Sequence, residues 1–114
     1  MPTYVLLSTL TSKGRQTMHA NPDRLEVVNK EIAAWGCRVL AQYAVLGQYD
    51  FVTIIQAPDN ESVSQLSVEL GSRGTVNIQT LPAITTLVLR KKLKDAGKTP
   101  RAARKGTRRR KRKG

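Results

Sequence analysis

The sequence contains almost none of the residues from which disulfides and most metal sites are built. Among 114 residues, Cys37 is the only cysteine and His19 the only histidine. A single cysteine excludes an internal disulfide, and no cysteine–histidine spacing typical of a zinc site occurs. We therefore expect no metal site, and the lack of disulfides favours a reducing compartment.

Long apolar runs and familiar catalytic motifs are also missing. No stretch is apolar for long enough to cross a bilayer, and the N-terminus lacks the cationic start and apolar block of a secretory signal. We therefore expect an intracellular, cytoplasmic protein. A P-loop, a G-x-S-x-G motif and an HExxH motif are all absent. The sequence predicts no catalytic residue, reaction type or cofactor, and a non-enzymatic protein is favoured.

The two potentially reactive side chains have ordinary interpretations. His19 stands among polar neighbours, which favours an exposed side chain. Cys37 follows Gly36 at the start of an expected strand, where a free cysteine is most often a buried thiol.

Charge divides the chain into two parts. Residues 1–89 carry six cations and seven anions, a net charge of −1, whereas residues 90–114 carry fourteen cations and one anion, a net charge of +13. All of the excess charge is therefore in the last quarter. We expect one α+β domain over residues 1–89 and a lysine- and arginine-rich extension, the basic tail, over residues 90–114.

Residue patterns in the first part predict four strands and two helices. Strands are expected at 3–10, 37–46, 51–56 and 76–81, with a further β-rich piece at 84–89. Residues 11–20 are polar and predict at most one or two loose helical turns. The first helix starts near Asn21, the expected cap, and ends at Gly36, whereas Asp59 is expected to cap the second.

This order of elements, βαββαβ, is that of the ferredoxin-like fold, in which two helices cover one face of a four-stranded antiparallel sheet. The first and third strands are expected in its centre. Their side chains are apolar on both faces, because Val5 and Leu7 alternate with Tyr4 and Leu6, and 51–55 behaves alike. A sheet with one wet face should alternate apolar and polar residues. A second subunit is the simplest cover, which predicts a dimeric α/β barrel.

Several pieces of the chain, in the right order, resemble the GYD-domain family of small bacterial and archaeal proteins. They are the opening 1–5, the turn 47–52 (GQYDFV), 57–59 (APD), 70–74 (LGSRG) and the Thr80-Leu81 ending. The resemblance covers roughly residues 1–85 and leaves the tail out. It implies a ferredoxin-like, dimeric α/β-barrel fold and carries little information about biochemical role.

Tyr49 and Asp50 are the best candidates for a pocket in the first part. Their G-x-Y-D turn is also similar to one in the ligand-sensing domains of feast/famine regulators, where it lies by an effector site between subunits. Arg38 or His19 would complete such a pocket. The ordinary interpretation is turn chemistry, because a turn aspartate usually binds its own backbone and a turn tyrosine usually packs.

The basic tail predicts a polyanionic partner. Without aromatics, and with Leu93 as its one large apolar residue, it should be disordered when free. Its cations suit phosphate backbones rather than bases. The expected nucleic-acid-binding residues are Arg90, Lys91, Lys92, Lys94, Lys98, Arg101, Arg104, Lys105, Arg108, Arg109, Arg110, Lys111, Arg112 and Lys113.

The function expected from these features is that of a nucleic-acid-binding accessory protein whose first part forms a homo-oligomer. Composition does not separate RNA from DNA. The tail is similar to the extensions of ribosomal proteins and to histone tails, and structured RNA, in a ribosome-associated role, is slightly preferred. The alternative is a small-molecule-sensing or enzymatic α/β barrel with an incidental tail. A membrane partner is disfavoured, because the tail shows no amphipathic stripe and no lipidation cysteine.

Overall fold

The computed structural model describes residues 1–98. The chain divides into two compact units, residues 1–83, here called the body, and a second unit that begins at Ile84.

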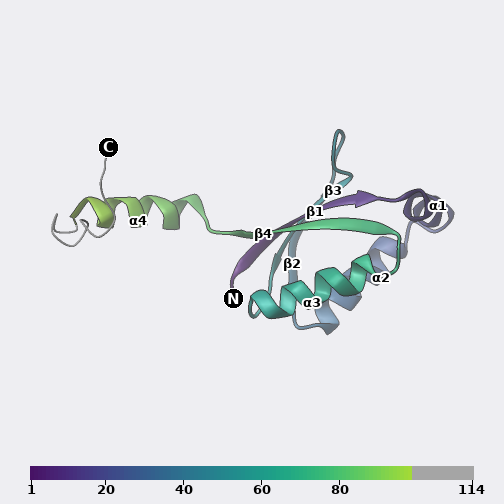
Figure 1. Cartoon of the computed structure of the whole chain (residues 1–114), viewed down its shortest axis with the longest axis horizontal. Helices are drawn as coiled ribbons and strands as arrows, with labels where there is room; N and C mark the ends of the chain where they lie inside the picture. The colour runs from purple at the N-terminus through teal and green to yellow at the C-terminus, as the bar shows by residue number, and fades with distance from the viewer. Residues whose placement is uncertain (99–114) are drawn as a thin grey trace. The chain divides into compact units, whose positions relative to one another are not determined.

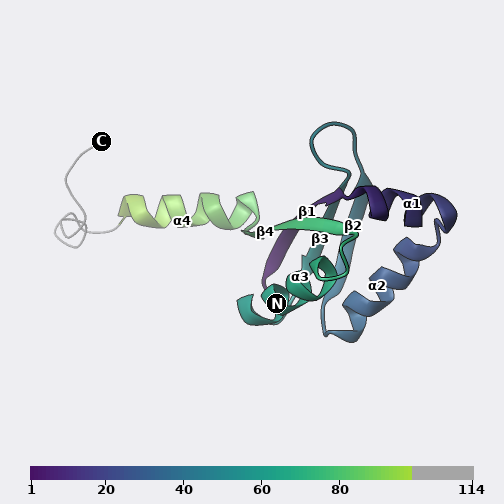
Figure 2. The same cartoon turned by 45° about the vertical axis from the view of Figure 1, so that its right-hand side comes forward.

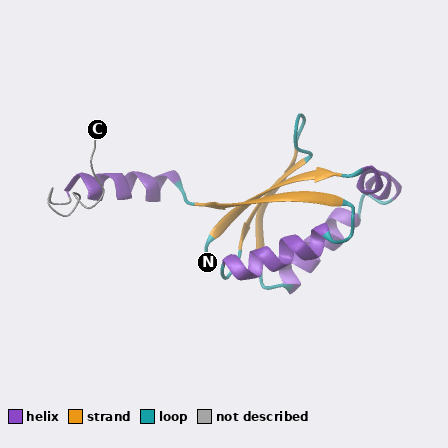
Figure 3. Ribbon diagram, viewed as in Figure 1, coloured by secondary structure: helices purple, strands orange, loops and turns teal. Residues whose placement is uncertain are grey.

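The body is built on one antiparallel sheet of four strands (Figures 1 and 3). The strands are β1 (Thr3–Leu10), β2 (Arg38–Ala44), β3 (Phe51–Gln56) and β4 (Val76–Ala83). They lie in the order β2-β3-β1-β4, so β1 and β3 are central. The expected ferredoxin-like arrangement and its central strands are confirmed.

Two long helices lie along one face of this sheet (Figures 1 and 2). They are α2 (Arg24–Ala34) and α3 (Asn60–Gly71). Asp59 caps α3 as expected, because its Oδ1 accepts a hydrogen bond of 2.7 Å from the Ser62 amide. The expected cap of α2 is wrong: Asp23 is the residue before that helix, and the Asn21 amide instead donates to the Thr17 carbonyl.

A third helix of the body, α1 (Ser12–Ala20), replaces the one or two loose turns expected there. Thr11 fixes its first turn, since its hydroxyl accepts from the Gly14 amide and donates to the Gly74 carbonyl. The Thr11 amide donates to the Thr75 carbonyl at 3.0 Å. These contacts with residues about sixty positions away explain why local polarity concealed a regular helix.

The core lies between the sheet and its helices. Tyr4, Leu6 and Ile55 point from the central strands into it, each at most 3% exposed. The expected stripe of α3 is buried against them, and consists of Val63, Leu66 and Leu70. Burial of these side chains is the main force that holds the body together.

The C-terminal unit differs from the sequence expectation. Residues 84–89 were expected to be β-rich, but β4 ends at Ala83 and the helix α4 (Thr86–Lys98) follows. The Thr85 hydroxyl accepts from the Val88 amide at 3.2 Å, a bond that starts the helix. The beginning of the basic tail, residues 90–98, is therefore helical rather than irregular. The disorder expected for 99–114 lies outside the described residues.

No helix within residues 1–98 has the length and apolar character needed to cross a membrane.

Candidate functional site

The face of the sheet that no helix of the body covers is apolar at its centre. The strand register places Val5 opposite Ile54 and Leu7 opposite Val52. These four side chains are half-buried, whereas Tyr4, Leu6 and Ile55 on the other face are buried. We call this surface the open face. Its centre is the second apolar face that the sequence predicted for the central strands.

Further residues extend the open face to both edge strands. Tyr43 on β2, opposite Val52, and Leu81 on β4, opposite Val5, are 58% and 38% exposed. Polar side chains surround them, namely Thr3, Thr9, Gln56, Asn77 and Gln79. Arg38, opposite Gln56 at the edge, is the one charged residue that the register of the four strands places here. An apolar centre inside a polar rim is the anatomy of a protein–protein interface.

The hairpin turn reaches onto the rim of the open face. The Tyr49 hydroxyl donates to Gln79 Oε1 at 2.8 Å, and the register places Gln79 opposite Leu7. The turn between β2 and β3 is therefore tied to β4 across the central strand β1. Tyr49 does not line the cavity found in the body.

Asp50 binds backbone. Its Oδ2 accepts from the Leu10 amide at 2.7 Å, and its own amide donates to the Ser8 carbonyl at 2.8 Å. Asp50 thus fastens the hairpin to the end of β1, forty positions away, rather than to the backbone of its own turn as the ordinary interpretation expected. A ligand pocket at Tyr49 and Asp50 stays a prediction.

The remaining candidate residues of the body, His19, Arg38 and Cys37, are either exposed or buried without forming a site with one another. His19 is exposed, as expected, and Arg38 is exposed at the sheet edge. Cys37 is 5% exposed, and burial raises the pKa of its thiol, so it is the buried thiol that the sequence predicted. Among residues 1–98, no three histidine, cysteine, aspartate or glutamate side chains are grouped so as to hold a metal ion.

The tail cations fall into two groups. Arg90, Lys91, Lys92, Lys94 and Lys98 belong to α4. The other nine, Arg101, Arg104, Lys105, Arg108, Arg109, Arg110, Lys111, Arg112 and Lys113, lie outside the described residues. The role expected of each cation stays a prediction.

An ion pair that sequence reasoning missed joins α2 to the loop after α3. Arg73 donates to both carboxylate oxygens of Glu31, at 2.8 and 2.7 Å. Hydrogen bonding from Arg73 holds the pKa of Glu31 below its usual range. The two residues are 42 positions apart, and no local signal distinguishes them from exposed charges.

The fold of the body defines an α+β protein of the ferredoxin-like class. A model of the GYD domain matches residues 4–93, and the chain belongs to that family. The chain is also similar to a Thermus thermophilus protein named glutamine synthetase and cystathionine beta-lyase binding protein. The two are 47% identical over 95 residues, which is 82% of this chain and all of the relative.

One solved structure is also similar. The crystal structure of TTHA0845 from Thermus thermophilus aligns with a TM-score of 0.48 and 23% identity, over 75% of this chain and 95% of that chain.

These comparisons correct the expected partner. The relative is named for binding two proteins, which contradicts the nucleic-acid partner inferred from the tail. The family match ends at residue 93, so most of the charge on which that inference rested lies beyond the part of the chain that defines the family.

Proposed function

We propose that this protein is a protein-binding module that pairs with a second copy of itself through the open face and, in that form, binds other proteins. The expected partners are enzymes of the kind for which the relative is named, a glutamine synthetase and a cystathionine beta-lyase.

The open face is the observation that carries this proposal. Val5, Leu7, Val52 and Ile54 form an apolar centre on the two middle strands, and no helix of the body lies over it. A contiguous apolar surface of this kind on a protein marks an interaction site. The polar rim and the single edge charge, Arg38, suit a surface that is desolvated at its centre and wet at its margin.

The dimensions of the open face suit a second copy. Four strands of up to eight residues, about 4.8 Å apart and rising about 3.3 Å per residue, span a flat face on the order of 500 Å². Side-chain relief makes the accessible area larger, and one side of a standard interface needs about 800 Å². Two such faces related by a twofold axis match apolar centre to apolar centre. The dimeric α/β barrel expected from the sequence is this arrangement.

The binding of other proteins is supported by the extent of the similarity. The relative aligns with this chain over its whole length, and about a fifth of this chain has no counterpart in it. This extent supports placing protein binding in the shared part of the chain. We assign it to that part and not to the basic tail.

The test uses the full-length chain and the two enzymes, glutamine synthetase and cystathionine beta-lyase, purified from the same cells. Each enzyme is immobilised, and binding of the wild type, Ile54→Lys and Val68→Lys is measured. Val68 is a matched control, because it is an exposed valine on α3, 72% accessible, away from the open face. We expect the wild type and Val68→Lys to bind at least one enzyme and Ile54→Lys to bind more weakly.

Each other result has a defined meaning. If neither enzyme binds the wild type, the protein-binding function is contradicted for these partners. If Ile54→Lys is monomeric and binds as well as the wild type, the function stands and the role given to the open face fails. Binding to both enzymes that a nuclease abolishes would show that nucleic acid bridges them and would contradict direct protein binding.

A further inference from the structure

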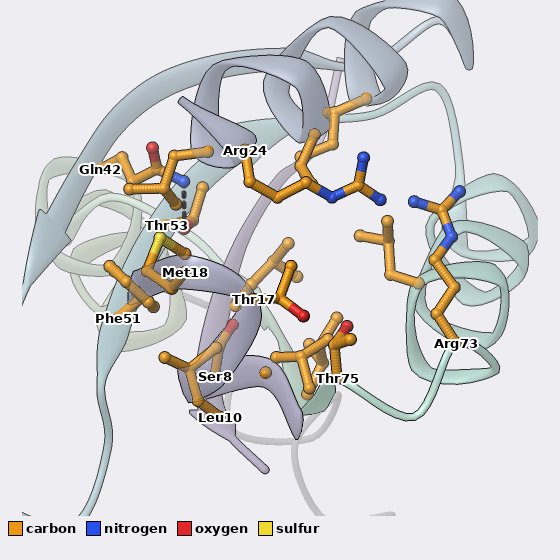
Figure 4. Close-up of a pocket in the computed structure, with 18 residues that line it drawn as sticks. Ser8, Leu10, Thr17, Met18, Arg24, Gln42, Phe51, Thr53, Arg73 and Thr75 are labelled. Carbon is orange, nitrogen blue, oxygen red and sulfur yellow. Dashed lines mark hydrogen bonds between the residues drawn. The ribbon is translucent and has the colours of Figure 1, made fainter. Parts of the chain in front are cut away.

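A cavity of about 110 Å³ lies inside the body, on the side of the sheet covered by helices (Figure 4). Residues of all four strands, of α1, α2 and α3, and of the loop after α3 line it. Most of its wall is apolar, and includes Leu6, Met18, Leu25, Val28, Phe51 and Ile78. A cavity of about 150 Å³ in another protein holds one benzene molecule, so this one is suited to a ligand of comparable or slightly smaller size.

Ser8 gives the cavity an unsatisfied polar group. The residue is 8% exposed and lines the cavity, and its hydroxyl makes no hydrogen bond to any residue between 1 and 98. The nearby Thr53 hydroxyl, by contrast, accepts from the Gln42 amide at 3.2 Å. Buried hydroxyls are almost always hydrogen-bonded, so the Ser8 hydroxyl calls for a partner from outside the chain.

Arg24 gives the same cavity a cation that forms no ion pair with any residue between 1 and 98. The charge of Arg24 helps to lower the pKa of Glu31, but both oxygens of that carboxylate are already bound by Arg73. Neither the ion pair of Lys30 with Glu26 nor that of Arg73 with Glu31 includes Arg24. Figure 4 shows the Arg24 and Arg73 guanidinium groups pointing toward each other, on the side away from Met18 and Phe51. Two guanidinium groups and one carboxylate leave a net positive charge there.

The cavity wall therefore presents hydrogen-bond donors without partners. Ser8 and Arg24 can each donate a hydrogen bond, whereas the Thr17 hydroxyl in the same wall already donates to the Lys13 carbonyl. An anionic oxygen is the complement of these donors. The apolar remainder of the wall excludes a bare inorganic anion as the natural occupant, because most of the cavity would then be left without contacts.

We infer that this cavity binds a small monocarboxylate with a short apolar body, its carboxylate hydrogen-bonded by the Ser8 hydroxyl and attracted by the positive charge of Arg24, and its body packed among Met18, Leu25, Val28 and Phe51. The site is separate from the open face, since the cavity lies behind the sheet under α1 and α2. It does not depend on the protein-binding function, and its test contains no second protein.

The experiment titrates the full-length chain with 3-methylbutanoate and follows backbone amide chemical shifts and heat. Seven non-hydrogen atoms at a typical binding efficiency give an expected dissociation constant of about 1 mM. The shifts should be confined to amides around the cavity, such as those of Ser8 and Thr75. The neutral 3-methylbutanamide has the same shape and should bind about tenfold more weakly, the size of a lost charge-assisted hydrogen bond.

Two variants and one control locate the donors. Arg24→Gln should weaken binding of the acid about tenfold, and Ser8→Ala should weaken it severalfold. Lys30→Gln removes an exposed cation from the same helix and should change nothing. The comparison of acid and amide needs only the wild type, so the test holds even if a variant does not fold.

The inference is overturned by any of four results. These are no saturable shift at ten times the expected constant, equal binding of acid and amide, equal competition by inorganic phosphate, or shifts on the open face instead of the cavity.

Discussion

At the scale of single residues, Asp50 shows how a turn is held in register. Its carboxylate accepts from the Leu10 amide, and its amide donates to the Ser8 carbonyl. Asp50→Ala leaves a partly buried amide without its charged acceptor and should lower the free energy of unfolding by about 1–3 kcal/mol. Urea denaturation measures this change. Asp50→Asn keeps an acceptor oxygen and should cost less, so equal losses for the two variants would contradict the role given to the carboxylate.

Gly14 marks the closest approach of α1 to the rest of the body. A Cβ atom built there would lie 1.9 Å from the Thr75 carbonyl oxygen. Gly14→Ala must therefore push α1 away from the loop and should destabilise the body by about 1–3 kcal/mol, although alanine is the better helix former. Gln16→Ala on the exposed side of the same helix is the control and should change stability by less than about 0.5 kcal/mol. A Gly14→Ala variant as stable as the wild type would show that α1 docks less tightly than described.

The pair of Glu31 and Arg73 predicts a pH dependence of stability. Arg73 lowers the pKa of Glu31 in the folded state, so Glu31 contributes stability above the ordinary glutamate pKa of about 4.3 and loses it as the pH falls through the lower folded value. The difference in stability between the wild type and Glu31→Gln should therefore be largest near neutral pH and shrink below about pH 4. Denaturation curves over a pH series measure it. A difference that is constant with pH would contradict the ion pair as its source.

Residue-level features were predictable from sequence only where their cause was local. The Asp59 cap and the buried Cys37 follow from neighbours in the chain. The Glu31–Arg73 pair and the unpartnered Ser8 hydroxyl depend on which elements meet in space. No residue spacing in the sequence predicts the ion pair or the unpartnered hydroxyl.

At the scale of elements, strands were the easier part to predict. The run of β-branched and apolar residues at 3–10 predicted the bounds of β1, and the order of elements predicted the central pair. The prediction of a β-rich piece at 84–89 was wrong, because β-branched and aliphatic residues favour a strand when they are considered in isolation. There is no further partner strand for it among residues 1–98, and α4 begins at Thr86 instead. In the same way, α1 depends on contacts between Thr11 and the Gly74–Thr75 loop, which the local sequence does not reveal.

The basic tail gives a prediction at this scale. Truncation after Lys98 removes nine cations and no acidic residue. Because the family match ends at residue 93, enzyme binding by the truncated chain should stay within about twofold of that of the full chain, measured at physiological salt to limit nonspecific attraction. If this truncation abolishes enzyme binding, the tail carries the binding function and its assignment to the shared part of the chain is contradicted.

At the scale of the whole molecule, the sequence predicted that something must cover the second face of the sheet. The central strands are apolar on both faces and therefore required a second cover, whereas the body supplies helices for one face only (Figure 1). What the sequence could not supply is the identity of a protein partner, because an apolar centre with a polar rim is complementary to many surfaces. The large charge of the tail drew the prediction toward nucleic acid, although the family is defined by the part of the chain that precedes most of that charge.

The central claim is that the open face joins two copies of the chain, and sedimentation equilibrium of the full-length protein tests it most directly. The wild type and the control Val68→Lys should sediment with twice the 12.6 kDa chain mass at micromolar concentration. Ile54→Lys places a charge in the apolar centre and should sediment as a monomer with an unchanged circular dichroism spectrum. A wild type that stays monomeric at every concentration, or an Ile54→Lys variant that remains dimeric, would contradict the account.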